Sequence, residues 1–128
     1  MSQTNFPLPA NFQLETYRIE RQLSHGGFSI VYLAHDAEGT PVAIKEYLPN
    51  SLALRGPDAI MPTISPEHSA AFNHGLKCFF EEGRAVARLD HPYLVRVTDL
   101  FRATGTVYLL MRYERGRNLP HHVRQYAR

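Results

Sequence analysis

The chain has 128 residues, 44% of them hydrophobic and 20% charged, so it can bury a core and has the composition of a globular domain. Its formal net charge of +2 comes from scattered basic residues, which argues against a surface built for nucleic acid or an anionic membrane. A single cysteine excludes a disulfide framework, and no apolar run reaches the ~18 residues of a membrane span, so we expect a cytoplasmic location.

The N-terminal part of the chain predicts an arm followed by three strands. Residues 1–16 contain two prolines and little periodicity, which is typical of an arm leading into a domain. Apolar and β-branched residues predict strands at 17–23, 29–35 and 42–47. A loop at 24–28 joins the first two strands, and a tight Glu-Gly hairpin leads into the third.

Residues 48–66 are rich in proline and predict a long ordered loop or insertion. The insertion either packs on the domain or serves as a docking or regulatory segment. Ser65 as N-cap, followed by Pro66, predicts the start of a helix over residues 67–89. Gly75 and Gly83 are points at which this helix could be interrupted.

The remaining residues predict two further strands, at 94–101 and 106–113, joined by a turn that contains a glycine. Residues 114–128 form a connector and the start of a final helix, with Asn118 as its cap. The predicted order is therefore three strands, one main helix and two strands, followed by the beginning of another helix.

Two features of the first three strands point to a ligand site. Gly26 and Gly27 between two strands form either a plain hairpin turn or a backbone loop that lies close over phosphates. The alternation of the third strand places Ala43 and Lys45 on the same face. Ala43 would leave room beside a flat ligand, and the Lys45 ammonium would reach further along that face.

The helix contributes a carboxylate to the same argument. Glu82 falls on one helical stripe with Phe79, Val86 and Leu89. If this stripe is buried, the charge needs a partner, and Lys45 is the natural candidate. Alternatively, Glu82 lies at the edge of the stripe and points into water.

These segments resemble the N-terminal lobe of protein kinases. Residues 23–32 and the Val-Ala-Ile-Lys run at 42–45 resemble the Gly-rich loop and the lysine-bearing strand of that family. Glu82, nine residues before a His-Pro pair, resembles the αC glutamate, and residues 108–113 resemble the fifth strand and hinge. The local amino-acid sequence of these motifs is most similar to that of bacterial eukaryotic-type (Hanks-type) serine/threonine kinases.

The resemblance implies an α+β fold in which a five-stranded antiparallel sheet carries one main helix (αC). The lobe would cover residues 17–113, with the insertion at 48–66 before αC and the hinge at 114–128. It would bind ATP, with Lys45 on the α- and β-phosphates and Glu82 holding Lys45 as the catalytic pair. The nucleotide-binding residues would be Leu23, Ser24, His25, Gly26, Gly27, Phe28, Ser29, Val31, Ala43, Lys45, Met111, Arg112 and Glu114.

Within that set, the resemblance assigns distinct roles. Leu23, Val31 and Ala43 would sandwich the adenine, Met111 would be the gatekeeper, and the backbone of Arg112 and Glu114 would bind the adenine edge. Ser24 and Ser29 stand where the family has glycines, which predicts a stiffer loop or weaker ATP binding.

The sequence lacks the His-Arg-Asp and Asp-Phe-Gly motifs, which supply the catalytic base and magnesium ligands of the family. We therefore expect no metal ligand in this chain, no kinase activity of the chain alone, and a longer serine/threonine kinase whose catalytic lobe holds Mg²⁺ and the protein substrate. The alternatives are a pseudokinase, or a regulatory module that consists of this lobe only. We expect no nucleic-acid partner, and self-association as a dimer through the surface that would face the catalytic lobe.

Overall fold

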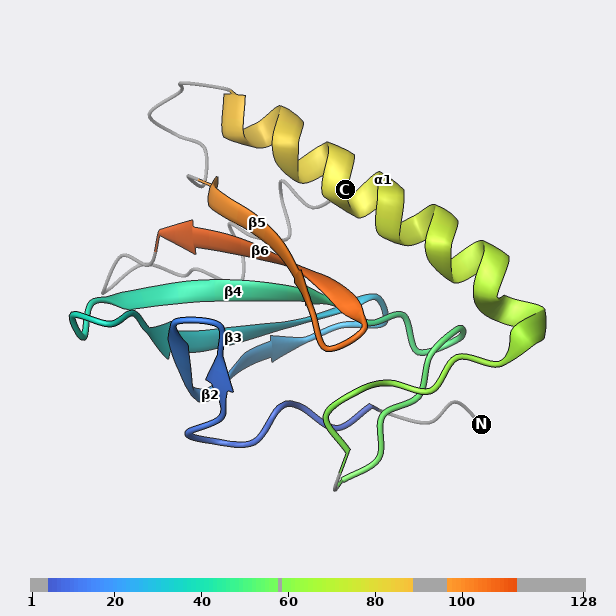
Figure 1. The fold of residues 1–128 in the computed structure, drawn as a ribbon, viewed down its shortest axis with the longest axis horizontal. Coiled ribbons are helices and arrows are strands. Elements are labelled where there is room, and N and C mark those ends of the chain that lie inside the picture. The colour runs from blue at the N-terminus through green and yellow to red at the C-terminus, as the bar shows by residue number, and fades with distance from the viewer. Residues whose placement is uncertain (1–4, 58, 89–96, 113–128) are drawn as a thin grey trace.

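The computed structural model describes residues 5–57, 59–88 and 97–112, in which one sheet carries one long helix (Figure 1). Its elements are β1 (Gln13–Leu14), β2 (Tyr17–His25), β3 (Ser29–His35), β4 (Pro41–Tyr47), a 3-10 turn (Pro66–His68), α1 (Ser69–Arg88), β5 (Val97–Ala103) and β6 (Thr106–Arg112). The 6 strands pair antiparallel in the order β1-β2-β3-β4-β6-β5.

The predicted α+β class with an antiparallel sheet and one main helix is confirmed, and one strand is added to the predicted five. The additional strand, β1, has only 2 residues, too few to produce a recognisable alternation. The predicted hairpins are confirmed, and Gly39 adopts a φ of 84° in the β3–β4 turn, where a side chain would be strained. The predicted final helix at 114–128 lies outside the described residues.

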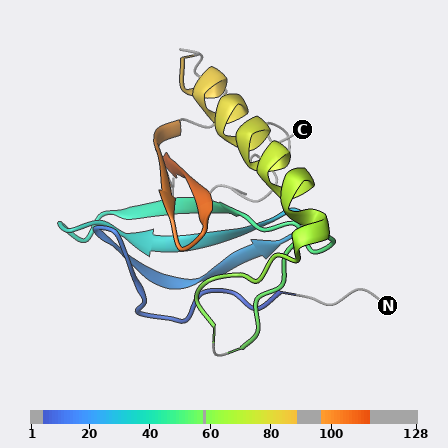
Figure 2. The ribbon, with the colours of Figure 1, turned by 45° about the vertical axis from the view of Figure 1, so that its right-hand side comes forward.

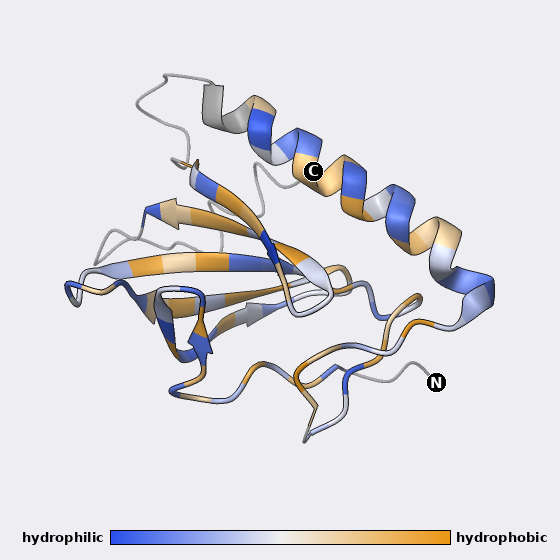
Figure 3. Cartoon of the chain, viewed as in Figure 1, coloured by the Kyte–Doolittle hydropathy of each residue, from blue (hydrophilic) through white to orange (hydrophobic). Residues whose placement is uncertain are grey.

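The helix begins two residues later than predicted and is not interrupted. Pro66–His68 forms a 3-10 turn, and Ser65 makes no side-chain cap, because its Oγ lies 2.9 Å from His68 Nδ1. Hydrophobic and hydrophilic residues alternate around the turns of α1 (Figure 3). Phe72 and Leu76 are buried against the sheet.

The two glycines of α1 allow the helix to lie close to the sheet. A Cβ atom at Gly75 would overlap Tyr47 Oη, and one at Gly83 would overlap Leu109 and would lie 2.8 Å from Leu100 Cδ2. The two glycines therefore do not interrupt α1. They let it lie close to the sheet, and this packing offsets their unfavourable helix propensity.

We expect Gly75→Ala to destabilise the fold by about 1–2 kcal/mol. The gain in helix propensity is about 1 kcal/mol, whereas overpacking against a ring that cannot move costs about 2–3 kcal/mol, the upper part of the usual range. The Tyr47 ring cannot retreat freely, because it is only 5% exposed and its hydroxyl donates to Phe72 O at 3.1 Å. Denaturant unfolding measures the loss, and the double variant with Tyr47→Phe should recover part of it relative to Tyr47→Phe alone. Equal stability of wild type and Gly75→Ala would contradict the close approach.

The face of the sheet opposite α1 is covered by the N-terminal arm and the proline-rich segment (Figure 2). Leu8 and Leu14 of the arm and Ala53 of the segment are buried. The segment closes on itself through a bridge between Leu54 and Thr63. Of the two interpretations of residues 48–66, packing on the domain is the one that the structure displays.

Candidate functional site

A small apolar cluster lies on the face of the sheet that carries α1. Val31, Ala43, Met111 and Val97 are buried together, with Leu23 and Leu109 packed against them. Strand register produces this cluster, because Ala43 pairs with Met111 and Leu33, and Val31 with Lys45. The structure therefore brings four of the expected adenine-site residues together: Leu23, Val31, Ala43 and Met111.

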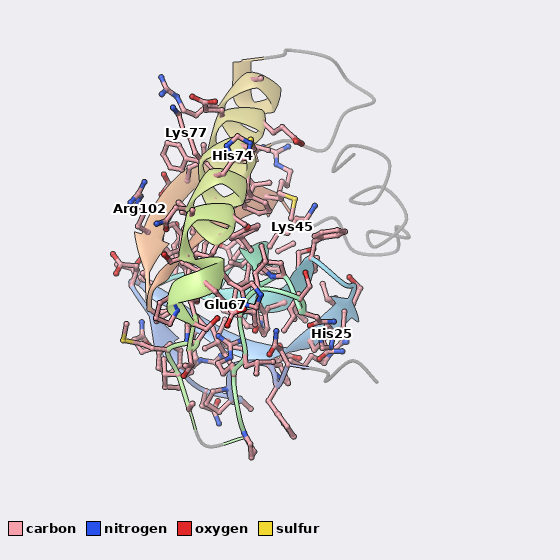
Figure 4. The ribbon with its side chains drawn as sticks, turned by 90° about the vertical axis from the view of Figure 1, so that its right-hand side faces the viewer. His25, Lys45, Glu67, His74, Lys77 and Arg102 are labelled. Carbon is pink, nitrogen blue, oxygen red and sulfur yellow. The ribbon has the colours of Figure 1, made fainter. Side chains whose placement is uncertain are left out.

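Lys45 extends this cluster along β4. It is only 7% exposed. Its Nζ lies 5.7 Å from the centroid of the Phe79 ring of α1, within the range of a cation–π contact. Figure 4 shows Lys45 between α1 and the sheet. A cation is thus held at the end of an apolar cluster.

Glu82 does not meet Lys45. In the described part of the chain, side-chain ion pairs within 4.0 Å join Glu20 to Arg21 and His35, and Glu46 to Arg55. Glu82 is exposed, whereas Gly83 beside it is buried. The buried stripe is rotated by about one residue from the predicted stripe, since Gly83 turns toward the sheet and allows the helix to lie close to Leu109 and Leu100. Of the two interpretations of Glu82, the structure displays the edge position.

The surroundings of Lys45 lower its pKa below the ordinary value of 10.5. Burial is the larger cause, and the charge of Glu82 raises the pKa by a smaller amount. The carboxylate therefore acts on the ammonium through space without contacting it.

We expect Lys45 to make the fold more stable as the pH rises. The folded state holds this proton less tightly than the unfolded state, so the destabilisation disappears between the lowered pKa and 10.5. Burial of Tyr32 and Tyr108 raises their pKa values above 10.0, so these tyrosines lower stability above pH 10. Unfolding free energies measured against pH should therefore rise more steeply below pH 10 in wild type than in Lys45→Met, and parallel curves would contradict the expectation.

The loop that resembles the Gly-rich loop is short and exposed at its tip. β2 ends at His25 and β3 begins at Ser29, which leaves residues 26–28 as the turn. Gly26 N–H donates to Ser29 O at 2.9 Å, and Phe28 is 73% exposed.

The two serines of this loop carry no backbone strain in this conformation. Ser24 pairs with Val31 and Ser29 with Tyr47, and neither serine has a positive φ. Serine is as acceptable as glycine in such extended backbone. The predicted stiffness of the loop therefore does not arise from strain at these positions.

The segment after β4 holds the loop from the side. Leu48 N–H donates to Phe28 O at 2.8 Å, and Asn50 N–H donates to Gly27 O at 2.9 Å. These two bonds continue the β3–β4 ladder onto the tip of the loop. Nothing in the sequence predicted this contact, because it joins a loop to an insertion.

On the opposite face, sequence reasoning missed a buried ion pair. Glu46 is 0% exposed, and Arg55 Nη1 and Nη2 donate to its two carboxylate oxygens at 2.6 and 2.8 Å. The hydroxyls of Tyr32 and Tyr108 also donate to this carboxylate, at 2.6 and 2.9 Å. Burial lowers the pKa of Arg55, but the hydrogen bonds and charge of Glu46 outweigh it and raise the pKa overall. The alternation of β4 was the available signal, since it places Glu46 on the same face as Ile44.

Of the remaining expected site residues, one is exposed and one is not described. Arg112 ends β6 and is exposed, while Glu114 lies outside the described residues.

Among the residues that the structure describes, no group of three or more His, Cys, Asp and Glu could hold a metal, and no helix is long and apolar enough to cross a membrane. A pocket of about 400 Å³ lies between the start of α1 and the β5–β6 turn, and none of the expected site residues lines it.

Comparisons with known proteins place this geometry among kinases. No protein-family model matches the chain. Serine/threonine-protein kinase ATG1c of Arabidopsis thaliana is 28% identical over 112 residues, which are 87% of this chain and 13% of that protein. The probable serine/threonine-protein kinase pknA2 of Bifidobacterium longum is 32% identical over 114 residues, 88% of this chain and 13% of that protein.

The structure also superposes on solved structures of other proteins. The apo form of PpkA-294 superposes with a TM-score of 0.81 at 33% identity, over 93% of this chain and 43% of that one. The PknI kinase domain of Mycobacterium tuberculosis superposes with a TM-score of 0.60 at 22% identity, over 94% of this chain and 42% of that one, which supports the fold alone.

The sheet and the single long helix have the fold of the N-terminal lobe of a protein kinase domain, as the superposition on the PknI kinase domain shows. The sequence relatives make the chain a homologue of serine/threonine protein kinases, bacterial ones included. The chain spans about 13% of the length of the curated relatives that it matches.

Proposed function

We propose that this chain is the ATP-binding lobe of a protein serine/threonine kinase that transfers the γ-phosphoryl group of ATP to protein hydroxyls. One observation carries the proposal. Lys45 places a buried ammonium at the end of the apolar cluster of Val31, Ala43 and Met111, with no carboxylate of the described residues within 4.0 Å. A flat aromatic ligand that carries anionic groups matches both parts of this site.

In this proposal the apolar cluster contacts the adenine, and Lys45 binds the α- and β-phosphates. The loop at residues 24–29 covers the phosphates with its backbone N–H groups. The backbone of Arg112 and Glu114 binds the adenine edge. Glu82 reaches Lys45 only after α1 turns or shifts along the sheet, because the two residues are apart in this structure.

Magnesium would neutralise the phosphate charge during transfer. The acidic residues of the described ranges do not gather into a metal site. The metal ligands and the catalytic base are therefore expected from a second lobe, and this chain's residues contribute binding and orientation of the nucleotide.

The proposal is tested by comparing residues 1–128 with a protein in which the same lobe is joined to its catalytic lobe. We expect the longer protein to phosphorylate serine or threonine in a magnesium-dependent assay, and residues 1–128 to bind ATP without phosphorylating anything. Robust phosphorylation by residues 1–128 would contradict the assignment of a single lobe. ATP binding by the longer protein without phosphoryl transfer would favour a pseudokinase, and no ATP binding by either would overturn the nucleotide site.

A further inference from the structure

The tip of the loop at 26–28 has few anchors of its own. Gly27 would have no neighbour within 4 Å of a Cβ atom, and the Phe28 side chain is 73% exposed. Besides the turn bond within the loop, its described backbone contacts are the two bonds from Leu48 N–H and Asn50 N–H. The position of the tip therefore depends on where the turn at residues 48–53 is held.

One side chain of the N-terminal arm holds that turn. Asn5 Nδ2 donates to Asn50 Oδ1 and to Ala53 O, both at 3.1 Å. Its Oδ1 accepts from Arg55 N–H at 2.7 Å. Asn5 is only 2% exposed, so its amide uses both its donor and its acceptor capacity within the protein.

The backbone beside Asn5 strengthens the same contact. Phe6 N–H donates to Arg55 O at 3.1 Å, and Arg55 Nε donates to Phe6 O at 2.8 Å. Arg55 is fixed in turn by its ion pair with Glu46, the residue that follows Lys45 in β4. The arm, the turn and β4 thus form one hydrogen-bonded unit behind the loop.

We propose that Asn5 is a positioning residue for nucleotide binding: its amide fixes the turn at residues 48–53, and this turn fixes the tip of the Gly-rich loop. The inference rests on the proposed function for its consequence and on the observed hydrogen bonds for its mechanism. A buried amide is a rigid support, because leaving any of its partners unpaired is costly. A loop held in place before the nucleotide arrives loses less conformational freedom on binding.

The test uses the protein that contains both lobes, with Asn5→Ala as the main variant. We expect the KM for ATP to rise roughly three- to tenfold with a smaller change in kcat, because ordering the loop then opposes binding. In the nucleotide-free protein, hydrogen exchange of the Leu48 and Asn50 amides should accelerate. Asn50→Ala removes a single acceptor of Asn5 and should produce the same changes to a smaller extent, which keeps the test valid if Asn5→Ala fails to fold.

Two controls separate positioning from general destabilisation. Ile19→Val shortens a buried side chain of β2 and removes none of the hydrogen-bonding groups of Asn5 or of residues 48–55. Asn73→Ala repeats the chemical change at an exposed position of α1. A rise in KM and in Leu48 and Asn50 exchange no larger in Asn5→Ala than in a comparably destabilised Ile19→Val protein would overturn the proposal. A wild-type protein that binds no nucleotide would overturn the proposed function. Hydrogen exchange of the Leu48 and Asn50 amides is measured without ATP, so it still decides whether Asn5 supports the loop.

Discussion

Glu46→Ala is expected to lower the free energy of unfolding by about 3–5 kcal/mol, because it leaves the Arg55 guanidinium buried and unpaired. Glu46 and Arg55 are 0% and 2% exposed, and the described structure leaves no buried side-chain polar atom without a hydrogen bond. The substitution also removes the acceptor of the Tyr32 and Tyr108 hydroxyls. Denaturant unfolding of the variant and the wild type measures the loss.

The comparison that isolates the unpaired charge is the double variant Glu46→Leu with Arg55→Met. Replacement of a buried ion pair by apolar side chains is often close to neutral, so this protein should be much more stable than Glu46→Ala. Tyr108→Phe removes two hydrogen bonds, one to Glu46 Oε2 and one with Thr104 Oγ1, and is expected to cost about 1–2 kcal/mol. A decrease in the free energy of unfolding below 1 kcal/mol in Glu46→Ala would show that water reaches Arg55 and that the Glu46–Arg55 pair is not shielded from solvent.

Lys45→Met is expected to reduce phosphoryl transfer by the two-lobed protein about 10²–10³-fold, because it removes a charge aimed at the phosphates. Methionine keeps much of the side-chain length without the buried charge, so the fold should be at least as stable as the wild type. Activity and stability would then change in opposite directions. Steady-state kinetics and unfolding curves of the same preparation measure both.

Lys77→Met is the matched control for this substitution, because Lys77 lies on the exposed side of α1. It should retain activity within about twofold, as surface substitutions usually have small effects. Wild-type turnover in Lys45→Met would contradict the nucleotide site.

The glutamate of the proposed pair is tested separately. We expect Glu82→Ala to abolish activity of the two-lobed protein as well, since α1 must bring this carboxylate to Lys45 for the proposed function. Glu81→Ala is its control, because Glu81 points about 100° away around the helix. Normal turnover in Glu82→Ala would contradict the pairing of Glu82 with Lys45.

The local sequence predicted the strands and the helix well because their patterns are periodic. The alternation in β4 placed Ala43 and Lys45 on one face, and the structure shows Ala43 in the apolar cluster that Lys45 extends. The helix face is predicted less well: the helical pattern assigns Phe79 and Glu82 to one buried stripe, whereas in the structure Gly83 faces Leu109. The phase of a helix depends on what it packs against, and a single sequence contains that information only in part.

Contacts made by irregular segments could not be predicted. Asn5 and Arg55 lie in stretches without periodicity. The partners of Asn5 are about 50 residues away, and two of them are backbone atoms with no sequence signature. The alternation could have identified Glu46 as a charge on a buried face. It could not have identified Arg55 as the partner, since a proline-rich loop has no register that fixes which side chain points inward.

The strands at the two edges of the sheet also affect how copies of the protein meet one another. β2 lies near one edge with register shifts after Ile19 and Gln22, and β5 forms the other edge with a shift between Val97 and Asp99. Such bulges twist the edge backbone, and exposed charges such as Asp99 and Arg102 oppose the approach of a second strand. The open ends of the sheet are therefore poor templates for strand-by-strand aggregation.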